Sequence, residues 1–232
     1  MKNTDPHELH KFTIHAANWW DKNGPVKTLH DINPIRLEFI QNYTSLNGQV
    51  VLDVGCGGGI LTESLAKAGA YVTAIDPNIS LINVAKLHAV ENQLTIDYHC
   101  TTAEELAVNK PLFDVITCME LLEHVPDPAS LVCCLSTMLK PNGQLFLSTI
   151  NRTLKAYAFA IIAAEHVLKL LPKGTHDYEK LIKPSELRQW CESSGLSLQH
   201  MKGIAYQPFS KRYSLTNDVS INYLFYAKKN ND

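Results

Sequence analysis

The stretch Val50-Val51-Leu52-Asp53-Val54-Gly55-Cys56-Gly57-Gly58-Gly59 decides the fold of this chain. Its first five residues form the continuous aliphatic run that is typical of a buried parallel strand, and a helical pattern follows from Ile60 to Lys67. Glycines at this junction let the backbone adopt positive φ and let a ligand approach the main chain. The following helix offers unpaired N–H groups. The stretch therefore predicts a nucleotide-binding turn.

The spacing of these glycines distinguishes between nucleotide cofactors. A dinucleotide-binding turn has the pattern G-x-G-x-x-G, whose third glycine packs the helix on the strand beside a pyrophosphate. Counted from Gly55, the third position is Ile60, so the pattern fails. The next apolar run, 71–75, ends on Asp76, where a carboxylate can accept hydrogen bonds from the ribose hydroxyls of NAD or of any other adenosine cofactor. Asp76 thus indicates an adenosine cofactor, and Ile60 argues against NAD.

Composition places the chain in a broad class. With 232 residues, 45% of them hydrophobic, we expect one domain with a sizeable core. The formal net charge of −2 gives no electrostatic argument for nucleic-acid binding. The six cysteines form no C-x-x-C pair and the N-terminus has no apolar signal region, so we expect a cytoplasmic protein without disulfides or a zinc site.

Periodicity predicts an alternating order of elements. Apolar residues at helical spacing indicate a helix at 8–21, and Asn33-Pro34 has the form of an N-cap followed by a first-turn proline, which predicts a helix through Ile40. The predicted strands are 50–54, 71–75, 95–100, 113–119, 144–150, 196–201 and 219–226. The predicted helices between them are 59–68, 80–91, 128–139 and 184–193. We therefore expect an α/β fold, doubly wound, with a mostly parallel seven-stranded sheet and helices on both faces.

The order of these elements also predicts how the chain is divided. We expect one domain, 1–232, with an N-terminal helical cap (1–45), a cofactor-binding core (48–150), an apolar helical insertion (151–183) and a C-terminal helix with strands (184–232). Ligands of such sheets bind at the carboxyl ends of the strands. That rule predicts that Gly55, Asp76 and Met119 lie along one rim.

Several other motifs resemble a known family. They are W-W-D (19–21), I-N-P-I-R-L (32–37), A-K-L-H-A (85–89), T-C-M-E-L-L-E-H-V-P-D-P (117–128) and P-K-G-T-H (172–176). Together with the glycine turn, they resemble the bacterial ubiquinone biosynthesis O-methyltransferases, which are class I S-adenosylmethionine-dependent methyltransferases with a Rossmann-like fold. The resemblance runs from about residue 8 to 227. It implies methylation of phenolic hydroxyls on 2-polyprenyl-6-hydroxyphenol and on 3-demethylubiquinol.

The resemblance also implies which residues contact S-adenosylmethionine. They are Arg36, Gly55, Asp76 and Met119. Arg36 can hold the methionine carboxylate through two parallel hydrogen bonds, and Asp76 can accept from the ribose. Met119 ends a predicted strand and can press its apolar side chain on the adenine ring.

The run Glu120-Leu121-Leu122-Glu123-His124 supplies candidates for removing the proton of the phenol. A phenol with a pKa near 10 is hardly ionised at neutral pH, a deficit of roughly 4 kcal/mol. If the run is helical, Glu120, Glu123 and His124 share one face and could hold a divalent ion such as Mg²⁺. Alternatively, His124 is a direct general base. The resemblance implies metal dependence, so we expect Glu123 and His124 to be catalytic and all three residues to be metal ligands.

The apolar segment 154–171 has too short an uncharged run to span a bilayer. It predicts either a helix packed as a lid on the active site or an interfacial helix at the membrane where a polyprenyl substrate lies. For 154–182 we expect membrane-surface contact, helped by Lys169, Lys173 and Lys180. The implied partners are the lipid substrate and other quinone-biosynthesis enzymes, with a peripheral location at the inner face of the cytoplasmic membrane.

Three alternative functions stay open at this point. The first is an O-methyltransferase for a soluble small phenol, which would carry the same glycine turn, Asp76 and Met119. The second is an NAD-dependent dehydrogenase, which Ile60 disfavours. The third is a cofactor-binding scaffold without catalysis, against which the Glu120–His124 run argues.

Overall fold

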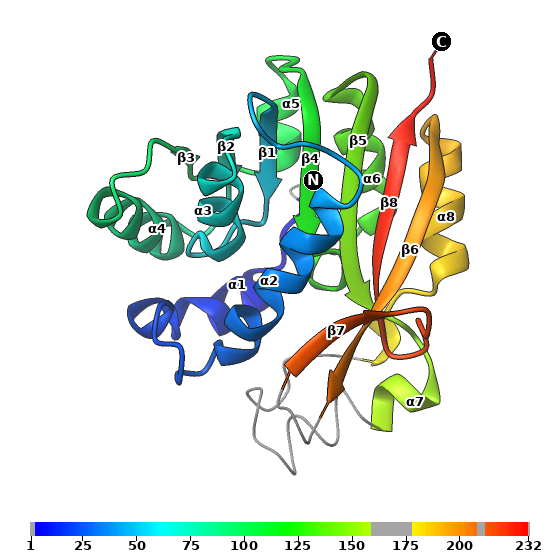
Figure 1. Cartoon of the computed structure of the whole chain (residues 1–232), viewed down its shortest axis with the longest axis horizontal. Helices are drawn as coiled ribbons and strands as arrows, with labels where there is room; N and C mark the ends of the chain where they lie inside the picture. The colour runs from blue at the N-terminus through cyan, green and yellow to red at the C-terminus, as the bar shows by residue number, and fades with distance from the viewer. Residues whose placement is uncertain (1–2, 159–177, 208–211, 232) are drawn as a thin grey trace.

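The computed structural model describes residues 3–158, 178–207 and 212–231, and a mostly parallel sheet runs through them. The strand order is β3-β2-β1-β4-β5-β8-β6-β7. Strands β1 to β5 pair in parallel, whereas β8, β6 and β7 are antiparallel to their neighbours (Figure 1). The strands are β1 (Val50–Val54), β2 (Tyr71–Ile75), β3 (Asp97–His99), β4 (Phe113–Met119), β5 (Leu139–Ile150), β6 (Leu196–Gln207), β7 (Arg212–Thr216) and β8 (Asn222–Lys229).

The sheet has eight strands in the described part of the chain, so the expected number of seven is wrong by one. Strand β6 continues to Gln207, beyond the expected end at 201, and pairs with the unpredicted β7. Strand β7 is five residues long and forms an edge of the sheet, where no residue is fully buried. An edge strand that mixes polar and apolar residues lacks the continuous aliphatic run that identified β1.

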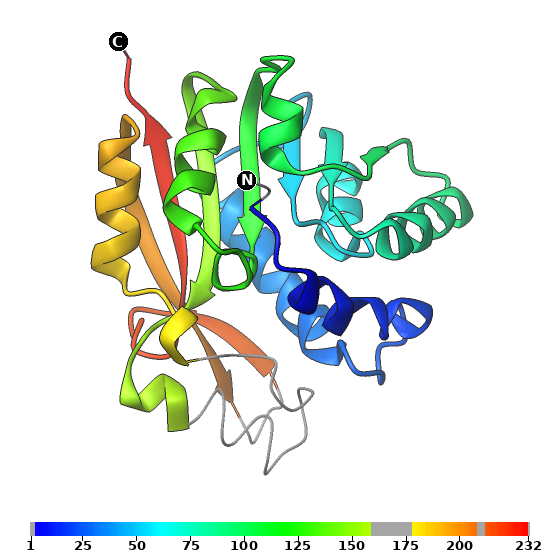
Figure 2. The same ribbon diagram turned by 180° about the vertical axis from the view of Figure 1, so that it is seen from behind.

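Helices cover both faces of the sheet, as expected (Figures 1 and 2). One face carries α2 (Lys27–Gln41), α3 (Ile60–Lys67) and α4 (Ile79–Glu91). The other carries α5 (Ala103–Ala107), α6 (Pro128–Thr137) and α8 (Pro184–Ser193). Strand β1 supplies both cores, because Val51 packs with Phe39 of α2 and Leu52 packs with Leu135 of α6. Side chains alternate across a strand, so one aliphatic run stabilises two layers.

The N-terminal helices differ from expectation. The helix predicted at 8–21 is a shorter α1 (Pro6–Thr13), followed by a 3₁₀ turn, η1 (Ala16–Asn18). The two apolar residues still meet despite this break, because the rings of Phe12 and Trp19 pack edge to face with their centroids 6.5 Å apart. The helix expected to begin at Asn33-Pro34 begins at Lys27, and Pro34 lies inside it. Asn33 is no cap, because its amide donates to the carbonyl of Ile60 and to the hydroxyl of Ser64 and so ties α2 to α3.

The insertion expected at 151–183 lies partly outside the described residues. Its described parts are α7 (Leu154–Ala156) and a 3₁₀ turn, η4 (Tyr178–Lys180); 159–177, most of the predicted helix 154–171, is not described. No helix in 3–158, 178–207 or 212–231 has the length and apolar character needed to cross a membrane.

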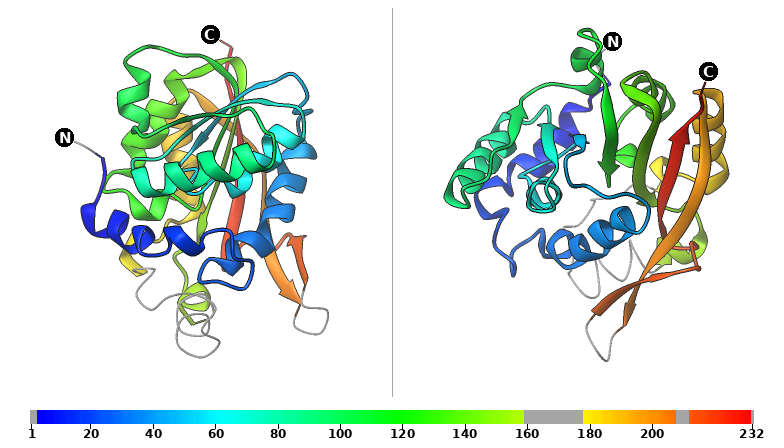
Figure 3. Two further views of the ribbon diagram at one scale, coloured as in Figure 1. Left: turned by 90° about the vertical axis from the view of Figure 1, so that its left-hand side faces the viewer. Right: turned by 45° about the horizontal axis from the view of Figure 1, so that its top comes forward.

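The carboxyl ends of the parallel strands meet the N-terminal helices. In Figure 1 the arrowheads of β1, β4 and β5 point to the end of the sheet where α1 and α2 lie. The β6–β7 hairpin projects at this same end, and β7 packs against α2 (Figure 3). Any site at this end is therefore built from both halves of the chain.

Candidate active site

A cavity of about 1040 Å³ lies at the carboxyl ends of the parallel strands. Its lining includes all four residues expected to contact the cofactor: Arg36, Gly55, Asp76 and Met119. Gly55 follows β1, Asp76 follows β2 and Met119 ends β4, so three neighbouring strands deliver them to one rim. This arrangement is the one that ligand-binding α/β sheets use.

The glycine turn is held in a form that only glycine adopts easily. Gly55 and Gly57 have φ of 69° and 54°, and a Cβ at Gly57 would lie 2.6 Å from the Trp19 ring. The turn is fixed by Asp76, whose Oδ2 accepts from the Gly57 N–H at 3.0 Å while Oδ1 accepts from Asn78 N–H at 2.8 Å. Trp19 from the N-terminal segment thus covers the backbone of the turn.

Asp76 is a buried carboxylate whose pKa is raised. Burial raises its pKa to about 6, the nearby Asp53 carboxylate adds to the rise, and the two backbone hydrogen bonds oppose it. Burial also raises the pKa of Asp53, which accepts hydrogen bonds from Thr62 and Thr117 at 2.6 and 2.7 Å. A ligand that donates hydrogen bonds to Asp76 would favour its ionised form.

Arg36 carries a buried charge beside the cavity. The residue is only 4% exposed, its Nη2 donates to the carbonyl of Leu29 at 2.9 Å, and its Nε has no hydrogen-bond partner among the described residues. Burial lowers the pKa of this guanidinium, and the carboxylates of Glu120 and Asp53 oppose that effect. A buried N–H without a partner is costly. The arginine therefore fits the carboxylate of an amino-acid-bearing ligand such as S-adenosylmethionine.

The segment after β4 is not the helix that would place Glu120, Glu123 and His124 on one face. Glu120 has a positive φ of 53°, and only a 3₁₀ turn, η2 (Leu122–His124), follows it. Glu120 Oε1 accepts from the Ser148 hydroxyl at 2.7 Å, and Glu123 Oε2 accepts from the Thr149 hydroxyl at 2.8 Å. Ser148 and Thr149 are consecutive on β5, so their side chains point to opposite faces of the sheet.

The three expected metal ligands therefore do not converge in this structure. Glu120 and His124 line the cavity, whereas Glu123 is buried outside its lining. Across the described ranges, no group of three or more histidine, cysteine, aspartate or glutamate side chains could hold a metal ion. As arranged in this structure, these residues do not form a Mg²⁺ site.

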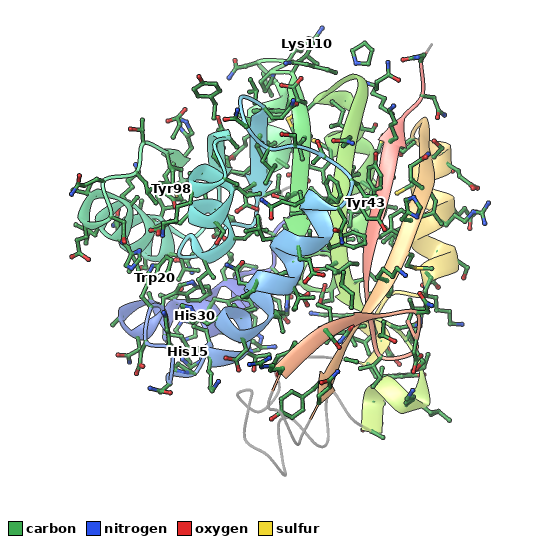
Figure 4. The ribbon with its side chains drawn as sticks, in the orientation of Figure 1. His15, Trp20, His30, Tyr43, Tyr98 and Lys110 are labelled. Carbon is green, nitrogen blue, oxygen red and sulfur yellow. The ribbon has the colours of Figure 1, made fainter. Side chains whose placement is uncertain are left out.

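The N-terminal segment supplies site residues that sequence reasoning missed. Glu8 of α1 lines the cavity, and its Oε2 lies 3.0 Å from Nδ1 of His124. Trp19 also lines the cavity, whereas Trp20 lies outside its lining and donates from Nε1 to the carbonyl of Gly58 at 2.9 Å. Figure 4 shows Trp20 near His30, between the N-terminal helices and the α3–α4 layer. The motif W-W-D contained the signal for the tryptophans. No spacing could reveal Glu8, because its partner lies 116 residues away in the chain.

The cavity extends from the cofactor rim to an apolar end. There it is lined by residues of α2 and of the β6–β7 hairpin: Leu29, Ile32, Ile204, Ala205, Tyr206 and Tyr213. Tyr206 and Tyr213 are directly opposite each other in the hairpin, with ring centroids 5.0 Å apart. We refer to these six residues as the apolar end of the cavity. It offers contact area to a hydrophobic substituent.

Comparison with known proteins identifies the family. Residues 29–201 match the model of a methyltransferase domain. The chain is 54% identical to a ubiquinone biosynthesis O-methyltransferase of Nitrosococcus oceani over 228 residues, which cover 98% of this chain and 97% of that protein. It is also 54% identical to the protein of that name from Actinobacillus pleuropneumoniae, with 98% and 100% covered.

Solved structures agree on the fold. Magnesium protoporphyrin IX methyltransferase from Synechocystis, solved with S-adenosylhomocysteine bound, superposes with a TM-score of 0.65 at 19% identity, covering 86% of this chain and 83% of that one. The dehydrogenase and scaffold alternatives are therefore not supported, and the expected class I fold is confirmed. This chain is an S-adenosylmethionine-dependent methyltransferase and belongs to the family of ubiquinone biosynthesis O-methyltransferases.

Proposed function

We propose that this protein transfers the methyl group of S-adenosylmethionine to phenolic hydroxyls of 2-polyprenyl-6-hydroxyphenol and 3-demethylubiquinol. The observation that carries the proposal is one cavity with two unlike ends, a rim of buried charges and the apolar end. A polar cofactor and an acceptor with a prenyl tail together need both ends. The names of the relatives at 54% identity support the same assignment.

The rim supports a specific orientation of the cofactor. Arg36 binds the methionine carboxylate through its unpartnered Nε, and Asp76 accepts from the ribose hydroxyls. Gly55 keeps the backbone close to the ligand, and Met119 packs on the adenine. The cofactor supplies an electrophilic methyl on a sulfonium. Because methyl transfer is an in-line displacement, the main work of these residues is positioning.

His124 is the residue we assign to the acceptor proton. It is 9% exposed and lines the cavity together with Met119 and Glu120. An imidazole is the side chain best suited to accept a proton near neutral pH. By removing the phenolic proton as the methyl arrives, it relieves the roughly 4 kcal/mol cost of ionising a phenol at neutral pH.

As an alternative to a direct base, we propose a divalent ion held by Glu120, Glu123 and His124, which would act as a Lewis acid on the acceptor oxygens. In that case His124 is a ligand of the ion and not the proton acceptor. Such a site requires the two glutamates to leave Ser148 and Thr149. With the ion bound there, exhaustive chelation should abolish methyl transfer, and Glu123→Ala should do the same without loss of S-adenosylhomocysteine binding. A chelated enzyme with its full rate would refute the metal site and leave the proton to His124.

The test of the proposed function uses tritiated S-adenosylmethionine and two catechols, one with a short prenyl chain and one without. We expect methyl transfer to both, with a higher kcat/KM for the prenylated acceptor. Equal kcat/KM would favour the soluble-phenol alternative, and no transfer to either would refute the proposal. Calorimetric titration should give binding of S-adenosylhomocysteine and none of NAD.

We also propose that residues 154–182 contact the membrane surface. Leu154, at the start, is 81% exposed. Lys169 and Lys173 lie outside the described residues, and Lys180 pairs with Asp5 and Glu8 at 3.4 and 3.1 Å. Deleting 154–182 should abolish co-sedimentation with anionic liposomes; unchanged co-sedimentation would refute this contact. The cytoplasmic location and the association with other quinone-biosynthesis enzymes stay predictions.

A further inference from the structure

We infer that Glu8 of helix α1 is a positioning residue for methyl transfer, whose carboxylate holds His124 through Nδ1 and so makes Nε2 the nitrogen that accepts the proton of the acceptor. This inference rests on the proposed function, in which His124 acts on the acceptor hydroxyl. It adds an N-terminal residue that acts through the histidine.

The contact is short, buried and on the cavity. Glu8 Oε2 and His124 Nδ1 are 3.0 Å apart, the two residues are 5% and 9% exposed, and both line the cavity. Charged side chains are seldom this buried unless they are paired. A carboxylate in this place therefore needs partners. Lys11 and His124 both pair with Glu8 and both line the cavity, and His124 is the one that contacts Oε2.

The charge state of Glu8 determines which histidine nitrogen carries the proton. Glu8 Oε1 lies 3.1 Å from the ammonium groups of both Lys11 and Lys180, and this pairing with two cations favours the carboxylate form. Glu8 is therefore an ionised carboxylate, which can only accept hydrogen bonds. Nδ1 must then donate, so the neutral ring has its lone pair on Nε2. This is the arrangement that a carboxylate imposes on a catalytic imidazole.

The ring is also fixed sterically. Phe12, one turn after Glu8 on α1, meets the His124 ring edge to face, with centroids 5.1 Å apart. Residues four apart on a helix share a face, so Glu8 and Phe12 present one surface to the imidazole. Two contacts from one helix, one polar and one apolar, set both the direction and the plane of the ring.

Helix α1 is anchored on both sides of the cavity. Asn78, two residues after Asp76, donates to the carbonyl of Leu9 and to the Thr13 hydroxyl at 3.2 and 2.8 Å. On the other side, Asn3 exchanges hydrogen bonds with the backbone of Asp127 at 2.8 Å. The helix thus joins the loop of the ribose-binding acid to the segment that contains His124, and it holds Glu8 in register with both.

A purely structural role for Glu8 makes different predictions. In that case Glu8 stabilises the fold through its ion pairs with Lys11 and Lys180, both at 3.1 Å, and any loss of activity should follow from loss of stability. Asp5 provides a matched control, because it lies on the same segment and pairs with Lys180 but does not contact His124. Asp5→Asn makes the same acid-to-amide change and keeps a residue type suited to its helix N-cap.

The experiment compares Glu8→Gln, Asp5→Asn and Glu8→Asp on the full-length protein with the prenylated catechol. We expect Glu8→Gln to lower kcat about 100-fold. The KM for S-adenosylmethionine and the affinity for S-adenosylhomocysteine should stay within about twofold. Asp5→Asn should keep kcat within about twofold, and Glu8→Asp should recover part of the loss because it restores the carboxylate.

Two further readouts separate positioning from stability. Nitrogen-15 NMR of labelled histidine should give the Nδ1–H tautomer for His124 in the wild type and a shifted tautomer balance in Glu8→Gln. His124→Asn should be slow, and adding Glu8→Gln to it should cost little more, since the two act as a unit. If His124→Asn is slow while Glu8→Gln matches Asp5→Asn, the role of Glu8 is wrong. If His124→Asn keeps the wild-type rate, the proton-accepting role in the proposed function is wrong, and the inference falls with it.

Discussion

The two ends of the cavity are built in different ways. The cofactor rim comes mainly from strand ends and the turns that follow them, β1 to Gly55, β2 to Asp76 and β4 to Met119, and helix α2 adds Arg36. The acceptor side combines α1, α2, η2 and the β6–β7 hairpin, which are far apart in the sequence. The rim depends on backbone geometry at neighbouring strand ends, whereas the acceptor side depends on long-range docking of side chains.

The two ends also differ in their electrostatics. The rim contains three buried ionisable groups, Arg36, Asp53 and Asp76, each with a pKa displaced by burial. The apolar end contains no charge among Leu29, Ile32 and the four hairpin residues that line it. Charge-assisted contacts are stronger than apolar ones, so single substitutions should act strongly at the rim and mildly at the apolar end.

The largest effect should follow from Arg36→Met. This change removes the two guanidinium hydrogen bonds that we propose for the cofactor carboxylate, each a bond to a charged group, so we expect about 100-fold weaker S-adenosylhomocysteine binding. Calorimetry measures it. The cofactor-free protein should be as stable as the wild type or more so, because a buried charge without a full set of partners is replaced by an apolar side chain of similar length.

Arg188→Met is the control for Arg36→Met, because Arg188 is exposed on α8 and pairs with Glu192 there. It should leave both affinity and melting temperature unchanged. Equal affinity for Arg36→Met and wild type would remove the distinction between a charged rim and an apolar end.

A smaller effect should appear in the pH dependence of cofactor binding. In the cofactor-free protein the pKa of Asp76 is about 6. In the proposed binding mode, the ribose hydroxyls donate to its ionised form. Below pH 6 the carboxyl must lose a proton on binding, so affinity falls as pH decreases and is constant above about pH 7. Between pH 7 and pH 5 we expect about a tenfold loss of S-adenosylhomocysteine affinity. Asp76→Asn should bind S-adenosylhomocysteine weakly, with an affinity that does not change with pH. A wild-type affinity that does not fall between pH 7 and pH 5 would contradict the assignment of Asp76 to the ribose.

The same contrast explains how much the sequence could predict. Strands 50–54, 71–75 and 113–119 and helix 184–193 have the expected bounds, because buried aliphatic runs and proline at a helix start are local signals. Gly55, Asp76 and Met119 followed from those strands, since each comes at a strand end, whereas Arg36 lies on α2 and was implied by the family resemblance. The order of the elements placed the rim without any tertiary information.

The acceptor side, and short elements elsewhere in the fold, could not be predicted in this way. Helix α5 has five residues, fixed by a capping box between Thr102 and Glu105, and is too short to show helical periodicity. Strand β7 is an exposed edge. Glu8 and His124 belong together only after α1 has docked, and the shared face expected for Glu120 and His124 fails because Glu120 adopts positive φ. Such contacts depend on the tertiary fold, which local patterns do not contain.

The smallest predicted effect tests the apolar end itself. Ile204 of β6 lines the cavity, so Ile204→Ala should remove apolar contact with a prenyl tail. The lost methyl and methylene contact is partly buried and contributes about 1 kcal/mol. We therefore expect about a fivefold higher KM for the prenylated catechol. Leu215 is directly opposite Ile204 in the hairpin but outside the cavity lining, so Leu215→Ala controls for hairpin stability. If the two variants change the KM equally, or if Ile204→Ala raises the KM of the catechol without a tail as much, the hairpin does not bind the tail. A higher KM for the prenylated catechol in Ile204→Ala alone would instead mean that the acceptor side determines substrate selectivity, although its residues could not be predicted from the sequence.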